Sequence, residues 1–266
     1  MANRWLICDV SYMAWRSAWA MKDLDLGITF GILRDVFVRR SHYTGFVFAF
    51  DFPPYLRASV YPGYKDRDPD PPEKAAMKKV LYKEIRRLRE EILPELGYRN
   101  VFSQAGYEAD DVIAGVVKGM PSEDRAVIVS SDQDLWQLLT PNVEIRAGLN
   151  GQSVTFDSFR AEWGIEPSDW SRVKALAGCD GDGVVGIKGI GEKTAAKYVK
   201  GLLKQESVAF KLISDNEGME AKNLPLVKLP WPGLRDFSPR EDKATVARWE
   251  QVCKGLGMNS LRQLEG

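Results

Sequence analysis

Three short apolar runs recur along the chain, and each of them ends at an acidic residue. They are 5–8 before Asp9, 46–50 before Asp51, and 126–129, which continues through two serines to Asp132 and Asp134. Runs of this length, rich in β-branched and aromatic residues, are typical of buried strands. Helical patterns lie between them, which predicts an α/β fold with a parallel, twisted sheet.

The three strand-end acids are expected to converge on one crevice, because the carboxyl ends of parallel strands meet at one edge of a sheet. An Asp at such a place can also begin a turn or cap a helix, so each one alone is ambiguous. The three together favour a site.

Apolar residues at three- and four-residue spacing predict a long helix that follows a loop rich in Pro and Asp at 62–73. The helix positions are Met77, Leu81, Ile85, Leu88, Ile92 and Leu96. A second helix is predicted over 108–117. It begins with Glu108, Asp110 and Asp111, and three acids in four residues exceed what helix capping needs.

The pattern changes near residue 159, after which the chain is predicted to be mostly helical without a further strand. We therefore expect two domains, one over 1–158 with the sheet and a helical one over 159–266. The proline-rich stretch 224–240 predicts an extended crossing segment, and 240–256 predicts a last short helix.

Composition narrows the possible chemistry. Of 266 residues, 37 are Lys or Arg and 37 are Asp or Glu, which argues against a wholly basic nucleic-acid coat but allows a divided surface. The single histidine, His42, argues against a His-rich zinc site and most Ser-His-Asp arrangements. Three distant cysteines without a C-x-x-C indicate a reducing compartment. With no signal peptide and no membrane span, we expect an intracellular, cytoplasmic monomer without membrane contact.

The acidic residues form the first candidate site. Its members are Asp9, Asp51, Glu108, Asp110, Asp111, Asp132 and Asp134. So many carboxylates raise one another's pKa unless cations neutralise them. Oxygen ligands without histidine predict Mg²⁺, with Mn²⁺ as a substitute, rather than zinc. Two such ions about 4 Å apart could clamp a phosphodiester.

The second candidate site is the glycine-rich segment 186–195, which reads GIKGIGEKTA. Its glycines let the backbone approach a ligand, and a helix beginning near Glu192 would direct N–H groups at an anion. It resembles a helix-hairpin-helix clamp for a phosphate backbone, which reads no bases; a simple tight turn is the alternative. The candidate DNA-binding residues are Gly186, Lys188, Gly189, Gly191, Lys193, Thr194 and Lys197.

A third group, in and around the proline-rich loop, contains Arg57, Tyr64, Lys65 and Arg67. Cations beside an acidic metal site indicate that a polyanion lies between them, and Tyr64 could stack on a base. A solvated loop is the alternative.

These motifs, in this order, resemble the 5′-nucleases of the flap endonuclease family, including the 5′-nuclease domain of bacterial DNA polymerase I and free-standing bacteriophage 5′-exonucleases. The most specific are GYEADD at 106–111, DQDL at 132–135 and the segment 186–195. The resemblance implies a PIN-like domain with a helical arch at about 57–96 and a helix-three-turn-helix domain with its clamp at about 183–200. It implies a Mg²⁺-dependent 5′→3′ exonuclease and flap endonuclease that acts on branched or 5′-ended duplex DNA with two metal ions.

The resemblance also implies roles for single residues. Asp9, Asp51, Glu108, Asp110 and Asp132 would hold the first ion, with Asp111 nearby, and Asp134 and Asp182 the second. Lys65 would contact the scissile phosphate, Arg57 would belong to the same catalytic motif, and Tyr64 would lie beside the splayed terminal nucleotide. The hairpin at 186–191 could hold K⁺.

The sequence departs from the family pattern ahead of the hairpin, where Gly-Asp-x-x-Asp-Asn is usual. Asp182 matches the second Asp, but Cys179 stands in place of the first, and Asp180 is one position out of register. We expect a second ion held weakly, mainly by Asp134 and Asp182, because a thiol is a poor ligand for Mg²⁺. The alternative is that Asp180 has taken over the role. Arg67 is one residue too close to Lys65 to match the family's next arginine.

Two other functions remain open from the sequence. One is a nuclease that removes RNA primers from RNA–DNA hybrids, or a PIN-type ribonuclease. The other is a non-catalytic, structure-specific DNA-binding protein with a weakened metal site, which the number of acids in place argues against.

Overall fold

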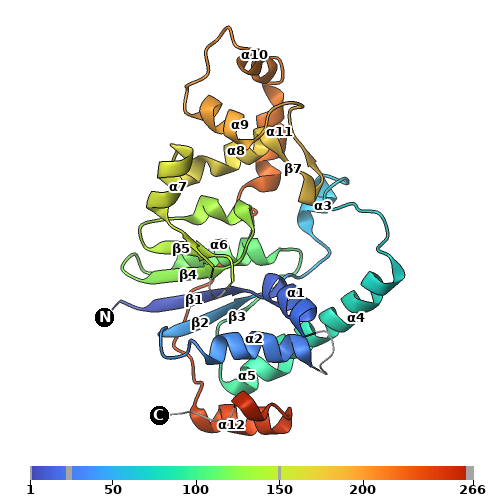
Figure 1. Cartoon of the computed structure of the whole chain (residues 1–266), viewed down its shortest axis with the longest axis vertical. Coiled ribbons are helices and arrows are strands. Elements are labelled where there is room, and N and C mark those ends of the chain that lie inside the picture. The colour runs from blue at the N-terminus through green and yellow to red at the C-terminus, as the bar shows by residue number, and fades with distance from the viewer. Residues whose placement is uncertain (1, 22–25, 149–150, 262–266) are drawn as a thin grey trace.

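A six-stranded sheet lies in the broad lower half of the molecule (Figure 1). The computed structural model describes residues 2–21, 26–148 and 151–261. The strands are β1 (Arg4–Asp9), β2 (Gly45–Ala49), β3 (Val101–Phe102), β4 (Arg125–Val129), β5 (Val143–Arg146) and β6 (Ser153–Val154). Their order is β3-β2-β1-β4-β5-β6, with only β6 antiparallel to its neighbour. The three predicted strands are confirmed as the adjacent β2, β1 and β4.

Alternate residues of the central strands enter two different cores. Leu6 and Cys8 of β1 face one core, with helices α1 (Val10–Ala20), α2 (Gly27–Phe37) and α12 (Val246–Gly255). Trp5 and Ile7 face the other, with α6 (Ala109–Gly119), α7 (Phe156–Trp163) and α8 (Trp170–Ala177). A sheet covered on both faces explains why its strands are apolar runs without alternation.

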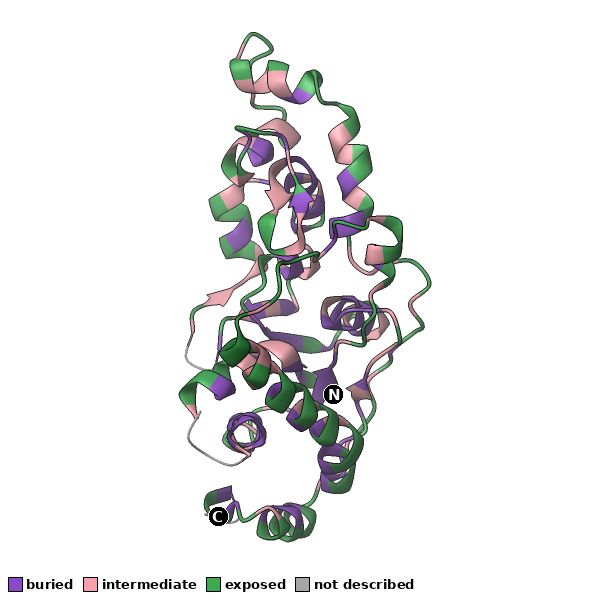
Figure 2. Cartoon of the chain, turned by 90° about the vertical axis from the view of Figure 1, so that its right-hand side faces the viewer, coloured by how far each residue is buried: buried purple, intermediate pink, exposed green. Residues whose placement is uncertain are grey.

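The predicted long helix is confirmed, with an irregularity. It consists of α4 (Pro72–Arg87), a π-helical turn η1 (Leu88–Ile92) and α5 (Leu93–Leu96). A short helix, α3 (Leu56–Val60), and a loop precede it, so that 56–87 crosses from the upper part of the molecule back toward α2 (Figure 1). Most of α4 is exposed (Figure 2).

The narrow upper part is mainly helical (Figure 1). It contains α8, α9 (Glu192–Val199), α10 (Val208–Ser214) and α11 (Gly218–Val227), with 3-10 turns η2 (Gln133–Leu138), η3 (Pro167–Asp169) and η4 (Asp180–Asp182) nearby. A last 3-10 turn, η5 (Asn259–Leu261), contacts α2 and α12 in the lower part. The prediction of no further strand was wrong, because β7 (Gly178–Cys179) and β8 (Val184–Val185) pair antiparallel around η4. Two-residue strands leave no periodic pattern.

The stretch predicted as extended is partly helical. Residues up to Val227 belong to α11 despite Pro225. Asn223 is buried and donates 2.9 Å hydrogen bonds to the carbonyls of Ala175 and Val185, which fastens α11 to its neighbours. The last helix begins at Val246, later than predicted.

The predicted domain boundary at 158/159 falls inside α7, and the division into two domains stays a prediction. The outer ends of the two predicted domains, residues 1 and 266, lie outside the described residues. No helix in the described part of the chain combines the length and apolar character that a membrane crossing requires.

Candidate active site

Four acids meet at the carboxyl edge of the sheet, and we call them the sheet-edge acids: Asp9, Asp51, Asp110 and Asp132. Asp9 caps α1, where its Oδ1 accepts from the Tyr12 N–H at 3.0 Å and its Oδ2 from the Ser130 hydroxyl at 2.8 Å. Asp51 accepts from the Ala109 N–H at the start of α6 at 3.0 Å. The strand ends and the two helix starts therefore fix the carboxylates in place.

The electrostatics of the sheet-edge acids favour a bound cation. Burial raises the pKa of Asp9 to about 7, and the charges of Asp51 and Asp132 add to the effect. Burial also raises the pKa of Asp110 well above its ordinary value, helped by Asp132, Asp9 and Glu108. Only oxygen donors are present, and a hard divalent cation such as Mg²⁺ fits such a set.

Glu108 lies beside these acids but is surrounded by donors. Its carboxylate accepts from the Tyr64 hydroxyl at 2.7 Å and from Arg57 at 3.2 Å, and it pairs with Lys65. Burial raises the pKa of Glu108, whereas the two cations lower it. Tyr64 is only 4% exposed and its hydroxyl is committed to Glu108. That Tyr64 lies beside the terminal nucleotide stays a prediction.

Arg57 and Asp111 form a buried ion pair beneath the site. Nη2 of Arg57 lies 2.8 Å from Oδ1 of Asp111, Nη1 pairs with Oδ2, and Nε donates to the Leu226 carbonyl at 2.9 Å. Oδ1 of Asp111 also accepts from the Trp231 N–H at 2.7 Å. Arg57 is 2% exposed and Asp111 0%. In this structure Arg57 and Asp111 are thus each other's buried partners. The expectations that Arg57 acts in catalysis and that Asp111 belongs with the metal ligands stay predictions.

Lys65 joins the sheet-edge acids to the upper part of the molecule. Its Nζ pairs with Glu108 and lies 3.4 Å from Oδ1 of Asp182, while its N–H donates to the Asp182 carbonyl at 2.8 Å. Its φ of 53° is in the left-handed region. Gly183 makes this docking possible, since a Cβ there would lie 2.5 Å from the Gly63 carbonyl oxygen.

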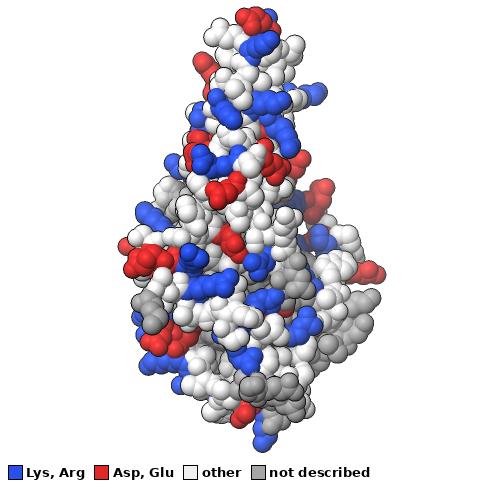
Figure 3. All heavy atoms as spheres, turned by 60° about the vertical axis from the view of Figure 1, so that its left-hand side comes forward, with Lys and Arg blue, Asp and Glu red and all other residues white. Residues whose placement is uncertain are grey.

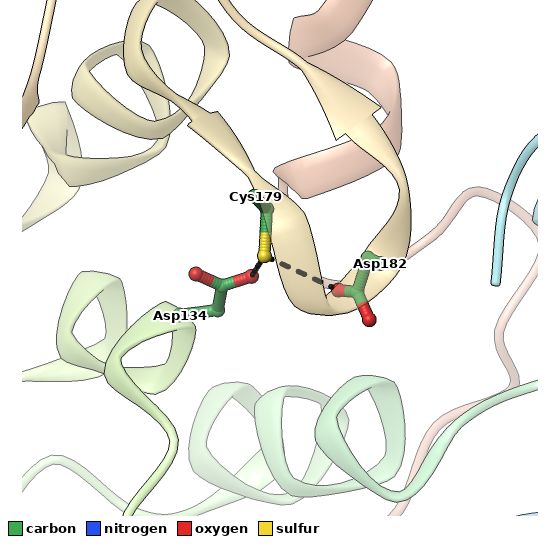
Figure 4. Close-up of side chains that lie close together, drawn as sticks. All are labelled: Asp134, Cys179 and Asp182. Atoms are coloured by element: carbon green, nitrogen blue, oxygen red, sulfur yellow. Dashed lines mark hydrogen bonds between the residues drawn. The ribbon is translucent and has the colours of Figure 1, made fainter. Parts of the chain in front are cut away.

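Asp134, Cys179 and Asp182 form a second group, which we call the thiol group. Their ligand atoms lie within 4.8 Å of one another, and the side chains point toward each other from η2, β7 and η4 (Figure 4). The Cys179 thiol donates to Asp182 at 3.6 Å and to Asp134 at 3.8 Å. Burial raises the pKa of Cys179 to about 12 and that of Asp134 to about 6. Asp180 is exposed and lies outside this group, and its role as a metal ligand stays a prediction.

Lys174 was not predicted. It lies on α8 with 8% exposed, and its Nζ is 3.2 Å from carboxylate oxygens of both Asp134 and Glu192. Burial disfavours its charge, but Asp134 and Glu192 outweigh that effect and raise the pKa of Lys174. The sequence feature that could have indicated a buried lysine is the position of Lys174 within the otherwise apolar segment 173–177.

Two open clefts lead to the sheet-edge acids. One, of about 640 Å³, is lined by Asp51, Lys65 and the loop and helix of residues 67–85. The other, of about 460 Å³, is lined by Asp9, Asp132 and Lys174. Both include Ser11 and Trp15 of α1, so Asp9, Asp51 and Asp132 line space that a substrate could enter.

The predicted hairpin precedes α9, which begins at Glu192 as expected. Gly186 packs on backbone, since a Cβ there would lie 2.2 Å from Ala177 atoms, whereas Gly191 faces open space. Lys188 and Lys197 are exposed, and Lys193 lies 4.9 Å above the Trp163 ring. Lys and Arg side chains gather on this narrow upper part (Figure 3). Gly189 and Thr194 complete the predicted set, and contact of the set with DNA stays a prediction.

Comparison with solved structures shows the same fold. The bacteriophage T5 D15 protein co-crystallized with metal ions superposes with a TM-score of 0.74 at 18% identity, covering 98% of this chain and 100% of that one. A complex of the bacteriophage T5 D15 flap endonuclease with DNA and metal ions gives a TM-score of 0.71 at 19% identity, covering 97% and 95% of the two chains.

Sequence comparison gives the family. The 5′-3′ exonuclease of Aquifex aeolicus is 32% identical over 204 residues, covering 73% of this chain and 68% of that protein. The thermostable DNA polymerase I of Thermus thermophilus is 30% identical over 208 residues, which are 74% of this chain but 24% of the polymerase. Residues 4–164 match the family described as 5′-3′ exonuclease, N-terminal resolvase-like domain. The chain therefore belongs to the 5′-3′ exonuclease family.

Proposed function

We propose that this protein hydrolyses phosphodiester bonds of DNA with a divalent cation, as a 5′→3′ exonuclease and structure-specific flap endonuclease. The observation that carries the proposal is the convergence of the sheet-edge acids from three strand ends and the start of α6. Without a bound cation, the repulsion between these carboxylates opposes their ionisation and destabilises the fold. The names of the relatives, an exonuclease and a flap endonuclease seen with DNA, support the same reaction.

The chain would hold Mg²⁺ or Mn²⁺ with Asp9, Asp51, Asp110 and Asp132. When bound, such a cation activates water and offsets the charge that develops on the phosphate. The sheet-edge acids support the first ion of a two-ion mechanism. The thiol group gives little support for the second ion, because it lacks the all-oxygen donors that Mg²⁺ prefers. We also propose that the hairpin at 186–191 binds K⁺.

The chain's own residues would position the DNA. Lys65, with 29% of its side chain exposed beside the acids, would contact the scissile phosphate. Glu108 and Arg57 hold the base of the arch against α6 and Leu226. We propose 1–158 as the catalytic domain and 159–266 as the domain that binds duplex DNA through the hairpin and α9. The substrate would be branched or 5′-ended duplex DNA, bound by a monomer.

The test is cleavage of three 5′-labelled substrates of matched sequence: a flap DNA, an RNA–DNA hybrid and a single-stranded RNA. Cleavage of the flap with Mg²⁺ and none with EDTA is expected, with the hybrid slower and the RNA intact. Asp110→Asn should remove activity, with Asp180→Asn as the matched control that keeps it. Preferred cleavage of the RNA or the hybrid would overturn the DNA assignment.

A further inference from the structure

Each carboxylate of the thiol group already faces an ammonium group. Oδ1 of Asp134 lies 3.2 Å from Nζ of Lys174, and Oδ1 of Asp182 lies 3.4 Å from Nζ of Lys65. Both lysines are held in place by a second acid, Glu192 for Lys174 and Glu108 for Lys65. A divalent cation among these oxygens would therefore have two positive charges as close neighbours, and their repulsion opposes its binding.

The third member of the group adds no charge to compensate. The Cys179 thiol donates to both carboxylates, as the dashed lines in Figure 4 show. A protonated thiol occupies space between the two acids without offering the oxygen that a hard cation takes as ligand. Asp180 is exposed and does not replace it. The donor set here does not fit Mg²⁺, unlike that of the sheet-edge acids.

We propose that Lys65 and Lys174 take the place of a second divalent cation in this chain, so that the DNA-free protein binds one Mg²⁺ or Mn²⁺ ion, at the sheet-edge acids. This inference rests on the proposed function, since it presumes that the sheet-edge acids hold the one ion. Cys179 is then the residue that sets the number of ions, because a carboxylate in its place would outweigh the two ammonium groups.

The test counts bound Mn²⁺ ions by electron paramagnetic resonance in the DNA-free, full-length protein, independently of cleavage. One ion is expected for the wild type and for Cys179→Asn. Two are expected for Cys179→Asp, which differs from the Asn variant only by its charge. Lys65→Ala, which removes one ammonium group at the partly exposed side of the group, should also allow a second ion. A wild type with two ions of similar affinity, or Cys179→Asp and Lys65→Ala that both stay at one, would overturn the proposal.

Asp110→Asn separates failure of this inference from failure of the proposed function. Loss of the single ion in this variant supports both the proposed function and the inference of one ion. Retention of that ion would place it outside the sheet-edge acids and overturn the metal assignment itself.

Discussion

Lys174 on α8 is hydrogen-bonded to Glu192, the first residue of α9, over 3.2 Å between Nζ and Oε1. The same Nζ lies 3.2 Å from Oδ1 of Asp134. One buried cation thus connects the helix that is proposed to bind the DNA backbone with Asp134 of the thiol group.

Removing this cation should destabilise the protein. Lys174→Met leaves the carboxylate of Asp134, 7% exposed, without its ion pair, and a loss of about 3 kcal/mol in the free energy of unfolding is expected. Glu192→Gln should cost less than about 1 kcal/mol, because its side chain is 31% exposed. Urea unfolding of both variants checks this; equal losses would mean that the contact with Asp134 contributes little.

Asp110 and Asp111 are neighbours in sequence with different expected roles. Asp110→Asn should abolish cleavage and leave the metal-free fold as stable as before or more so, because it removes one of several repelling charges. Asp111→Asn should lower the free energy of unfolding by about 3 kcal/mol, because Arg57 loses its buried partner. Urea unfolding with EDTA, beside flap cleavage with Mg²⁺, separates the two. An Asp111→Asn variant that is stable but inactive would indicate that Asp111 is a metal ligand.

The metal-free protein should lose stability as the pH rises from about 4 to about 7. Asp9 has a folded pKa of about 7, above the unfolded value of about 3.9, so the folded state binds more protons in this interval and the stability is lost as the pH rises through it. Asp134, with a pKa of about 6, adds to the loss. Saturating Mg²⁺ should remove the decline. Urea unfolding at pH 5 and pH 8, with EDTA or with Mg²⁺, measures it; a metal-free protein more stable at pH 8 contradicts the burial of uncompensated acids.

Lys65→Ala should lower the cleavage rate at saturating DNA by about 10²-fold or more while affinity changes little, by analogy with the loss of one donor to developing charge. Arg67→Ala is the matched control in the same loop, since Arg67 is exposed and bonded to the Gly181 carbonyl. Single-turnover kinetics and a binding titration give the two quantities. A defect in affinity alone would remove Lys65 from the reacting phosphate.

Lys188→Ala combined with Lys193→Ala should weaken DNA binding and reduce the salt dependence of affinity by about one unit for each phosphate that is no longer neutralised. Cleavage at saturating DNA should change less. Lys243→Ala with Lys254→Ala, two lysines near α12, is the control of equal charge. Binding isotherms between about 50 and 200 mM salt measure this salt dependence. If the affinity of the two double variants depends equally on salt, the hairpin is a turn without phosphate contacts.

The three central strands and the acids at their carboxyl ends could be predicted from the amino-acid sequence. Apolar runs ending in Asp9, Asp51 and Asp132 predict parallel strands, and parallel strands bring their carboxyl ends together whatever the rest of the chain does. The start of α6 at Ala109 and of α9 at Glu192 also followed from local signals. The placement of Asp182 and Cys179 beside Asp134 was implied by the family resemblance rather than by a local pattern, and the ligand atoms of the three residues lie within 4.8 Å of one another.

Which charged groups pair could not be predicted from the sequence. Arg57 and Asp111 are 54 positions apart, and Lys174 and Asp134 are also distant in the chain, so no local pattern relates them. The burial of Tyr64 was not predicted either, since a tyrosine in a polar loop is expected to be exposed. In the structure this loop packs against the start of α6 and against η4. The physical reason is that a charge or a ring shows its chemical type in the sequence, whereas its partner and its access to solvent depend on segments brought together by the packing of the two cores.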